Sequence, residues 1–574
     1  MKSTYGPIFI LLGILCCIHS ALSQIPYDEA YQKEALRNAE YITMFTDRNM
    51  YAVNERIYFS SYYRKDGESA IDCWSKVLYV ELVTSSGQVV ANGKFRHDEK
   101  GSSGYLLIPA DALTGYYYLR SYTRWMLNFG PGSYCYIPLT IINPYEQEVL
   151  TEGDESSGVE ADLFRVDLPG IQCQTDKASY APGEEVQLEL SLTVSDPKLR
   201  GEYCLTVAHA GLLDTLNAHF DIDDIDRGND FHIKYLPEIR GVSISGSVVN
   251  TEDQSPVPQT RLHFSSLGEQ ANYSATLTDE LGRFILTLPD RTGIQELFVA
   301  AEPLADSKRE IRIDQDFASE PVPFRTKQFT LSPDDKKIAI RMVLNMQLSK
   351  AYKSEEASPD SETETDSFVP FYGIPTTTVN IEEFVKLPTM NEVFVNLVPN
   401  VFVRYEEGEP YLYLEGVNRN ISLFPPLVLI DQIPLFEQKD LFAIDPLKVE
   451  RIEVINELYV RGDIVFGGII IMSSKQEDMA AVDLPEESYF FDYQGFHPEN
   501  SFATYYAAER IPDTRNTQLW IDKISLESEE KKTVQFPASS NPGEYHILVR
   551  GVSSRGEMVY GVSTFKVEQY EDYY

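Results

Sequence analysis

The sequence predicts a mainly β protein built from tandem β-sandwich modules, and three observations lead to this fold class. Apolar and polar residues alternate in many short stretches, which is typical of half-buried strands. The 33 glycines and 32 prolines supply frequent turns, while 36 tyrosines and 29 phenylalanines suit pleated surfaces. A stretch near the N-terminus recurs 129 positions later, which indicates a repeated module. At 574 residues the chain has room for about three to five domains.

Residues 1–23 have the pattern of a secretory signal. Lys2 provides a short positive region, an apolar run follows at 8–18, and Ala21-Leu22-Ser23 forms a cleavage-type site. The apolar run is shorter than a bilayer-spanning helix requires. Cys16 and Cys17 lack the small preceding residue that favours lipid attachment, so a lipid anchor is the minor alternative. We expect an exported chain without a transmembrane segment, in the periplasm or at the cell surface, held at the outer membrane by a partner.

The charge balance of the chain is strongly acidic. Its net charge is −39 at pH 7, and no run of Lys or Arg makes a local exception. This balance argues against binding to nucleic acid or to an anionic membrane surface through bulk electrostatics. It suits the solubility of an exported protein.

Residues 40–145 and 165–237 are predicted to form two β-sandwiches, which we call sandwich 1 and sandwich 2. Both begin with the same sequence pattern, which we call the opening. The common pattern T-D-[R/K]-x-x-Y-A-x-x-E occupies 46–55 and 175–184. Val53-Asn54 makes the turn in the first copy and Pro182-Gly183 in the second, since Asn tolerates a left-handed backbone. The pattern resembles the opening of macroglobulin domains in the α2-macroglobulin superfamily. A generic immunoglobulin-like sandwich is the alternative interpretation.

Four cysteines follow the signal: Cys73, Cys135, Cys173 and Cys204. An even number in an exported chain favours disulfides. The repeat assigns two cysteines to each sandwich, so we predict a Cys73–Cys135 and a Cys173–Cys204 bond, each worth roughly 3 to 4 kcal/mol. Macroglobulins that trap proteases covalently carry a thioester Cys followed by Glu-Gln, a context that none of the four has. The resemblance therefore implies the fold without the covalent trap.

Residues 239–313 form a predicted third module. Gly246-Ser247-Val248-Val249, Pro256-Val257-Pro258 and a T-D-E-L-G-R-F turn at 278–284 follow one another. They resemble a carboxypeptidase regulatory-like domain, which implies a small transthyretin-like sandwich.

Residues 320–352 are predicted as a strand followed by a helix. Ser332 is a good helix cap, Pro333 suits the first helical position, and acidic residues follow in the first turn. Residues 353–370 are polar and acidic, and predict a linker or a surface loop.

Residues 376–475, named the central block, contain three expected strands. They are an apolar run at 427–430, an alternating run around Ile452 and Val454, and a fully apolar run at 469–472. Gly467-Gly468 precedes the last run and gives the backbone freedom there. Together with a helix and a strand expected over residues 387–404, these strands predict a small α+β domain.

The central block resembles the plug domain of TonB-dependent outer-membrane receptors. It departs from that pattern at Gln432, where Gly is usual, and at Phe466-Gly467-Gly468, which replaces a common N-G-V. In Bacteroidota-type importers a carboxypeptidase regulatory-like domain commonly precedes the plug, and the same order occurs here. A plug closes a barrel of some 22 strands of about ten residues each. Since 99 residues follow Lys475, we expect the block to serve another purpose.

Residues 513–570 are predicted as a macroglobulin-like β-segment. Asn516-Thr517-x-x-Trp520 precedes several alternating strands. The segment is short for a whole sandwich. It either stands alone or completes a module begun at 320–352, which makes the central block an insertion.

Motifs of catalysis, nucleotide binding and metal binding are absent from the sequence. It contains no G-x-S-x-G elbow, H-E-x-x-H zinc helix, P-loop or G-x-G-x-x-G. The histidines are scattered singly, and the acidic cluster at 221–226 lacks the closing Glu of an EF-hand, so a solvated loop is favoured over calcium. We expect a chain that is not an enzyme and has no cofactor or metal.

These features predict a non-enzymatic envelope protein that acts as a docking or scaffolding subunit of an outer-membrane transport or assembly complex. We expect polar tips of the central block to contribute to the partner surface: Asp431, Gln432, Arg451, Arg461 and Asp463. Two alternatives stay open. One is a macroglobulin-like protease-binding or inhibitor protein without a thioester, with 353–366 as its bait-like stretch. The other is an enzyme with a dispersed active site.

Overall fold

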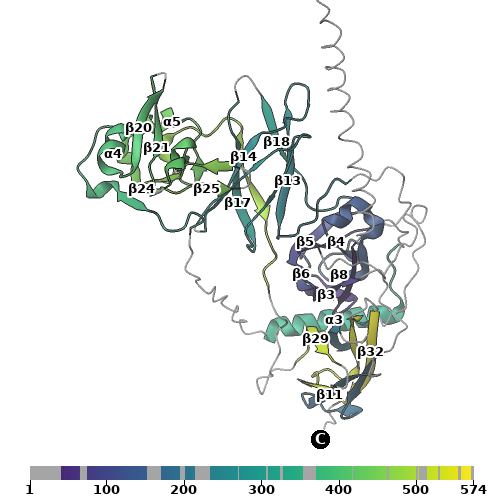
Figure 1. Cartoon of the computed structure of the whole chain (residues 1–574). Helices are drawn as coiled ribbons and strands as arrows, with labels where there is room; N and C mark the ends of the chain where they lie inside the picture. Colours follow the sequence, from purple (N-terminus) through teal and green to yellow (C-terminus); the bar gives the residue numbers. More distant parts are fainter. Residues whose placement is uncertain are drawn as a thin grey trace, which may run out of the picture. The chain divides into compact units, whose positions relative to one another are not determined.

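Strands dominate the computed structural model and confirm the mainly β fold class. It describes residues 40–64, 74–150, 170–193, 201–213, 233–268, 270–304, 308–322, 328–352, 370–406, 408–416, 418–461, 464–499, 502, 513–527, 530–553 and 558–569. The predicted signal, the acidic cluster at 221–226 and the stretch 353–369 lie outside these residues. The chain divides into two units, drawn in Figure 1. Unit 1 comprises Met1–Gly241, Phe317–Glu356 and His497–Tyr574, and unit 2 comprises Val242–Asp316 and Ala357–Phe496.

Sandwich 1 lies in unit 1 and has a three-stranded and a five-stranded sheet. The sheet orders are β1-β3-β6 and β2-β8-β7-β4-β5, and only β2 with β8 is a parallel pair. The strands are β1 (Tyr41–Thr46), β2 (Met50–Ala52), β3 (Arg56–Arg64), β4 (Val77–Val83), β5 (Val89–Arg96), β6 (Ser102–Leu107), β7 (Gly115–Tyr122) and β8 (Cys135–Ile142). Alternating residues such as Ile57 and Phe59 on β3 are fully buried, as their period-2 pattern predicts.

Sandwich 2 is assembled from two distant parts of the chain. Its sheets have the orders β10-β32-β31-β12-β29 and β30-β11-β9. The first part supplies β9 (Ile171–Thr175), β10 (Ser179–Tyr180), β11 (Glu185–Leu192) and β12 (Gly201–His209). The second part supplies β29 (Thr517–Leu526), β30 (Lys532–Pro537), β31 (Gly543–Ser553) and β32 (Met558–Val567). Figure 1 therefore shows the early strand β11 and the late, yellow strand β32 in the same sandwich, in its two different sheets.

This assembly corrects two predicted boundaries. Sandwich 2 is not contained in 165–237, and the segment 513–570 forms its sheets with 171–209 rather than with 320–352. One buried core joins the two parts, with Leu205 and Val207 packed among Ile547 and Val549. Alternation in a sequence shows which face of a strand is buried, but not which other strand it pairs with.

Helix α3 (Pro333–Tyr352) packs inside unit 1. Ser332 Oγ accepts a hydrogen bond from the N–H of Asp335 (3.1 Å), and Asp335 Oδ2 accepts one from the N–H of Ser332 (3.2 Å). This reciprocal pair is a capping box, and it begins the helix where the sequence predicts. Ala339 and Met342 of the helix are buried against Met50, Ala52 and Leu212. None of the described helices combines the length and the apolar character of a membrane span.

The third module, in unit 2, is a small sandwich of two sheets. Their orders are β16-β13-β18 and β15-β14-β17-β28. The strands are β13 (Ser243–Asn250), β14 (Arg261–Ser266), β15 (Asn272–Leu277), β16 (Arg283–Thr287), β17 (Ile294–Ala301), β18 (Arg309–Ile313) and β28 (Ser488–Gln494). The last of these follows the central block in the chain, so the module extends beyond the predicted 239–313.

The central block forms a five-stranded sheet with the order β19-β24-β27-β22-β23. Its strands are β19 (Thr377–Asn380), β22 (Leu427–Ile430), β23 (Ile433–Pro434), β24 (Val449–Ile455) and β27 (Ile469–Ser474), with hairpins β20 (Val401–Glu406)–β21 (Glu409–Leu414) and β25 (Tyr459–Arg461)–β26 (Ile464–Phe466). Helices α4 (Met390–Leu397) and α5 (Gln438–Ala443) complete it. The three expected strands are thus the adjacent strands β24, β27 and β22. A Cβ at Gly467 would lie 2.1 Å from the backbone O of Phe424, which explains the glycine there.

The predicted Cys173–Cys204 bond is wrong, because both residues are free thiols in the structure. Cys173 packs at the edge of the core between the two sheets of sandwich 2. Cys204 lies on β12 between Tyr203 and Leu205, which face that core, so its own side chain faces the opposite side. It is buried there against Phe45, Tyr62 and Trp520. The predicted partner of Cys135, Cys73, lies outside the described residues.

The shared opening folds into a hydrogen-bonded loop in sandwich 1. Tyr51 Oη donates to Asp47 Oδ1 (2.7 Å) and accepts from the N–H of Arg48 (3.0 Å). Glu55 Oε2 accepts from the N–H of Ala52 (2.7 Å).

The second copy repeats these contacts. Tyr180 Oη donates to Asp176 Oδ1 (2.6 Å) and accepts from the N–H of Lys177 (3.0 Å), and Glu184 Oε2 accepts from the N–H of Ala181 (2.8 Å). Asn54 (φ 65°) and Gly183 (φ 78°) hold the two turns in the left-handed region, which confirms the predicted turn.

The two copies differ in what covers them. Asp47 is fully buried, and its Oδ2 accepts a hydrogen bond from Thr517 Oγ1 at the start of β29. Glu55 Oε1 accepts another from Asn516 Nδ2 (2.8 Å). Asp176 is exposed. The first copy therefore joins sandwich 1 to the second part of sandwich 2.

We predict that Asp47→Asn destabilises unit 1 by about 3 kcal/mol, because it removes a buried carboxylate from Arg48, which then stays buried with one partner fewer. The matched change Asp176→Asn, in the exposed copy, should have a much smaller effect. Guanidinium unfolding followed on the unit 1 transition measures both changes. Equal effects of the two variants would show that burial of the Asp47 carboxylate beside Arg48 adds nothing to stability.

Candidate functional site

The predicted tips Asp431 and Gln432 form the two-residue turn between β22 and β23. Their φ angles are 45° and 73°, as a tight hairpin turn requires. Asp431 accepts hydrogen bonds from Ser474 N (2.7 Å), Ser474 Oγ (2.6 Å) and Met479 N (2.8 Å). The backbone O of Gln432 accepts one from Ser265 Oγ (2.6 Å) in the third module. Both residues therefore have contacts within unit 2, and Asp431 fixes the end of β27.

The other predicted tips lie apart from one another. Arg451 is 44% exposed and pairs with Glu453 (3.5 Å) on the same strand. It lies opposite Ser473 in β27, at the same end of the sheet as Asp431. Arg461 Nε donates a hydrogen bond to Tyr459 Oη (2.7 Å). Both residues belong to the β25–β26 hairpin, which comes in the chain just before the opposite end of β27. Asp463 lies outside the described residues, so the predicted tips do not form one described surface.

The central block instead exposes many apolar side chains. Of the 24 large apolar side chains that are exposed in the described part of the chain, ten belong to this block or the turn before it. They are Ile374, Phe384, Val385, Val395, Phe402, Tyr405, Leu423, Phe424, Leu447 and Val460. Val385 is 85% exposed and Leu423 is 73% exposed. This feature was not among the predicted site residues, because a sequence does not show which apolar side chains the core leaves out.

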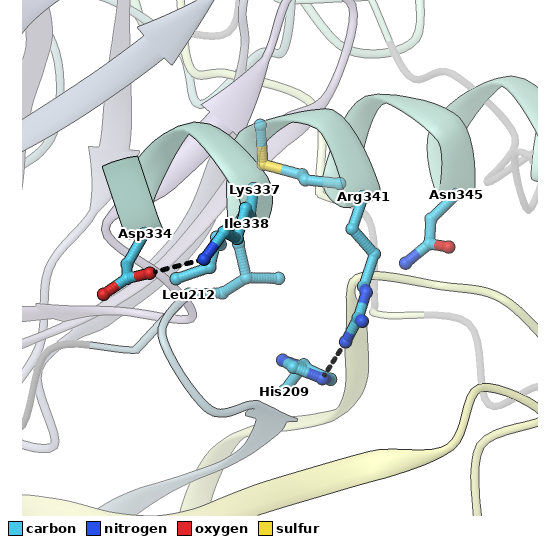
Figure 2. A pocket seen from close by; sticks show the side chains of 8 residues that line it. His209, Leu212, Asp334, Lys337, Ile338, Arg341 and Asn345 are labelled. Carbon is cyan, nitrogen blue, oxygen red and sulfur yellow. Dashed lines mark hydrogen bonds and ion pairs between the residues drawn. The ribbon is translucent and has the colours of Figure 1, made fainter. Parts of the chain in front are cut away.

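Unit 1 contains a hollow of about 180 Å³ beside α3, shown in Figure 2. Leu212, Ile338 and Met342 line it with apolar surface. The polar lining consists of Asp334, Lys337, Arg341, Asn345 and His209. Lys337, Arg341 and Asn345 follow one another at four-residue intervals, so they share one face of the helix.

His209 is held in one orientation at the edge of the hollow. Its Nδ1 lies 2.7 Å from the backbone O of Ala210 and its Nε2 lies 3.0 Å from Arg341 Nη1, as the dashed line in Figure 2 marks. Since Arg341 only donates, Nε2 accepts and Nδ1–H donates to Ala210. Burial lowers the pKa of His209, and the neighbouring Arg341 lowers it further. His209 is therefore neutral at pH 7.

The charged side chains of the lining give the hollow a net positive charge. Lys337 and Arg341 are cationic, while Asp334 is the single carboxylate of the lining. Asp334 pairs with Lys337 (2.9 Å), but both side chains are about four-fifths exposed, so this pair is weak. No hydroxyl or thiol lines the hollow, and the described residues contain no group of three metal-binding side chains. The arrangement suits binding of an anion. The helix spacing was visible in the sequence, whereas the position of His209 was not.

A second histidine, His97, is buried in the interior of the protein. His97 in sandwich 1 is 2% exposed, and neither of its ring nitrogens has a hydrogen-bond partner among the described residues. Burial lowers the pKa of His97 to about 4. The folded state thus holds a neutral imidazole that the unfolded chain protonates below its ordinary pKa of about 6.5.

We predict that unit 1 loses stability as the pH falls from 6.5 towards 4, because only the unfolded chain takes up a proton at His97 in this range. The loss attributable to His97 should reach about 3 kcal/mol at pH 4. Unfolding free energies from pH 4 to 8 should show a weaker pH dependence for His97→Gln than for the wild type. Parallel pH profiles of the two proteins would contradict the assignment, whatever the absolute stability of the variant.

Comparisons with known proteins assign no family to the chain. No family model matches it, and no curated protein matches it. A structure of Salmonella alpha-2-macroglobulin reacted with methylamine is 11% identical with a TM-score of 0.23, over 92% of this chain and 39% of that chain. The native conformation of E. coli alpha-2-macroglobulin is 10% identical with a TM-score of 0.23, over 92% and 40%. Dimeric latent PorU from Porphyromonas gingivalis is 8% identical with a TM-score of 0.17, over 48% and 33%. The chain spans about two fifths of the length of these macroglobulins.

Proposed function

We propose that the chain is a non-enzymatic, protein-binding scaffold of the bacterial envelope, and that its central block docks on an outer-membrane partner. The observation that carries this proposal is the concentration of exposed apolar side chains on the block. Single exposed apolar residues are common on soluble proteins, but ten in one module favour a surface that a partner covers.

The exposed side chains are not needed for folding of the block. Its core is closed by buried residues from the sheet and from both helices, including Ile452, Ile470 and Phe394. At one polar end of the sheet, Asp431 is also hydrogen-bonded within the block. Burial of further apolar area against a partner is therefore a net gain for association.

We predict that Val385→Asp or Leu423→Asp reduces recovery of the partner about tenfold, because a charge placed in an apolar interface must be desolvated. Both positions are exposed, so melting temperatures should stay within a few degrees. Leu107→Asp, at a 52% exposed position of sandwich 1, is the matched control. Pull-down of the tagged chain from native envelope membranes, with quantitative mass spectrometry, measures recovery.

Equal loss of the same partners with Leu107→Asp, or unchanged recovery with both block variants, would contradict docking through the block. Arg451→Glu and Arg461→Glu extend this test to the predicted polar tips. A decrease with Arg451→Glu alone would place the partner at the Ser473 end of the sheet.

A second candidate function is protease binding without a thioester. It is favoured by the macroglobulin-like opening, which forms the same hydrogen-bonded loop in both sandwiches. We predict for this candidate that trypsin or elastase cuts within 353–366 and then co-elutes with the cleaved chain in size-exclusion chromatography. Cleavage without co-elution would leave the docking function as the proposal.

A further inference from the structure

We propose that the hollow beside α3 binds a carboxylate carried by a short, branched apolar group. The C-terminal residue of a peptide and a free branched-chain acid both have this chemistry. The inference goes beyond the docking function, because the hollow belongs to unit 1 and shares no residue with the central block.

The charge of the lining selects an anion. Lys337 and Arg341 lie one helical turn apart on α3, and Asp334 offsets only one of them. Because His209 is neutral, the lining has a formal charge of +1 in a chain of net charge −39. An anion is therefore attracted to this positively charged hollow more strongly than to the rest of so acidic a protein.

The guanidinium of Arg341 is held ready for this anion. Its Nη1 donates to His209 Nε2 at 3.0 Å, and His209 is itself fixed by Ala210 and by the ring of Tyr545. A Cβ on Gly543 would lie 2.5 Å from His209 Nε2, so the glycine leaves room for the imidazole. Arg has five N–H donors, and a planar carboxylate accepts two of them side by side. Because His209 already accepts a hydrogen bond from Nη1, the side chain of Arg341 has less freedom before a ligand binds. It therefore loses less conformational entropy on binding.

The apolar side of the hollow specifies what the carboxylate is attached to. Leu212 and Met342 are buried there, and Ile338 is partly buried. A bare phosphate would make no apolar contact with this lining, whereas a leucine-sized group would pack against it. A hollow of about 180 Å³ admits a group of this size but not a folded domain.

Saturation-transfer NMR and calorimetric titration of the full chain test the proposal with N-acetyl-L-leucine and 4-methylpentanoate. We expect dissociation constants in the millimolar range for at least one acid. N-acetyl-L-leucine amide and inorganic phosphate should bind at least tenfold more weakly. Tighter binding of N-acetyl-L-leucine than of 4-methylpentanoate assigns the hollow to peptide C-termini, and the reverse assigns it to free acids.

Variants locate the binding on the helix. Arg341→Gln and Lys337→Gln should each weaken binding of the acid about tenfold, since each removes one cation from the lining. Lys336→Gln, an exposed neighbour outside the lining, should leave it unchanged. Equal binding of the acid and its amide, equal effects of all three variants, or no binding of either acid would overturn the proposal. Unchanged melting temperatures exclude unfolding as a cause of lost binding.

Discussion

The buried carboxylate of Asp47 is the contact on which the assembly of unit 1 depends. It accepts hydrogen bonds from Tyr51 and from the backbone of Tyr58 within sandwich 1, and from Thr517 at a separation of 470 positions. Thr517 begins β29, the first strand of the second part of sandwich 2. A buried charge that is fully hydrogen-bonded tolerates little displacement, because any lost partner leaves it unsatisfied in a medium of low dielectric. The contact therefore fixes where the returning chain enters sandwich 2.

The same arrangement explains how one chain carries two units. Third-module strands β13 to β18, the central block and β28 all lie in the sequence between β12 and β29 of sandwich 2. The entropy of closing a loop grows only slowly with its length, so a long insertion is tolerated when both of its ends are well bound. Sandwich 2 supplies such binding through one core shared by its two parts. The inserted unit is then free to expose apolar surface without weakening the sandwich that holds it.

The two candidate sites differ in the physical basis of recognition. On the central block, exposed aliphatic and aromatic side chains offer area, so recognition would depend on shape and on excluded water. Beside α3, a few charged groups around a small apolar floor offer specificity for one chemical group. Both sites suit a protein that binds.

Local patterns in the sequence determined much of this protein. The alternation predicted a mainly β fold, the T-D-[R/K]-x-x-Y repeat predicted two related openings, and Ser332-Pro333 predicted the start of α3. These features depend on residues within a few positions of one another. Tertiary structure alone decided that 171–209 and 517–567 share two sheets, that Cys204 faces away from Cys173, and that His209 meets Arg341. Strand pairing, the choice of buried face and contacts between distant elements depend on which apolar surfaces cover one another, and no local pattern records that choice.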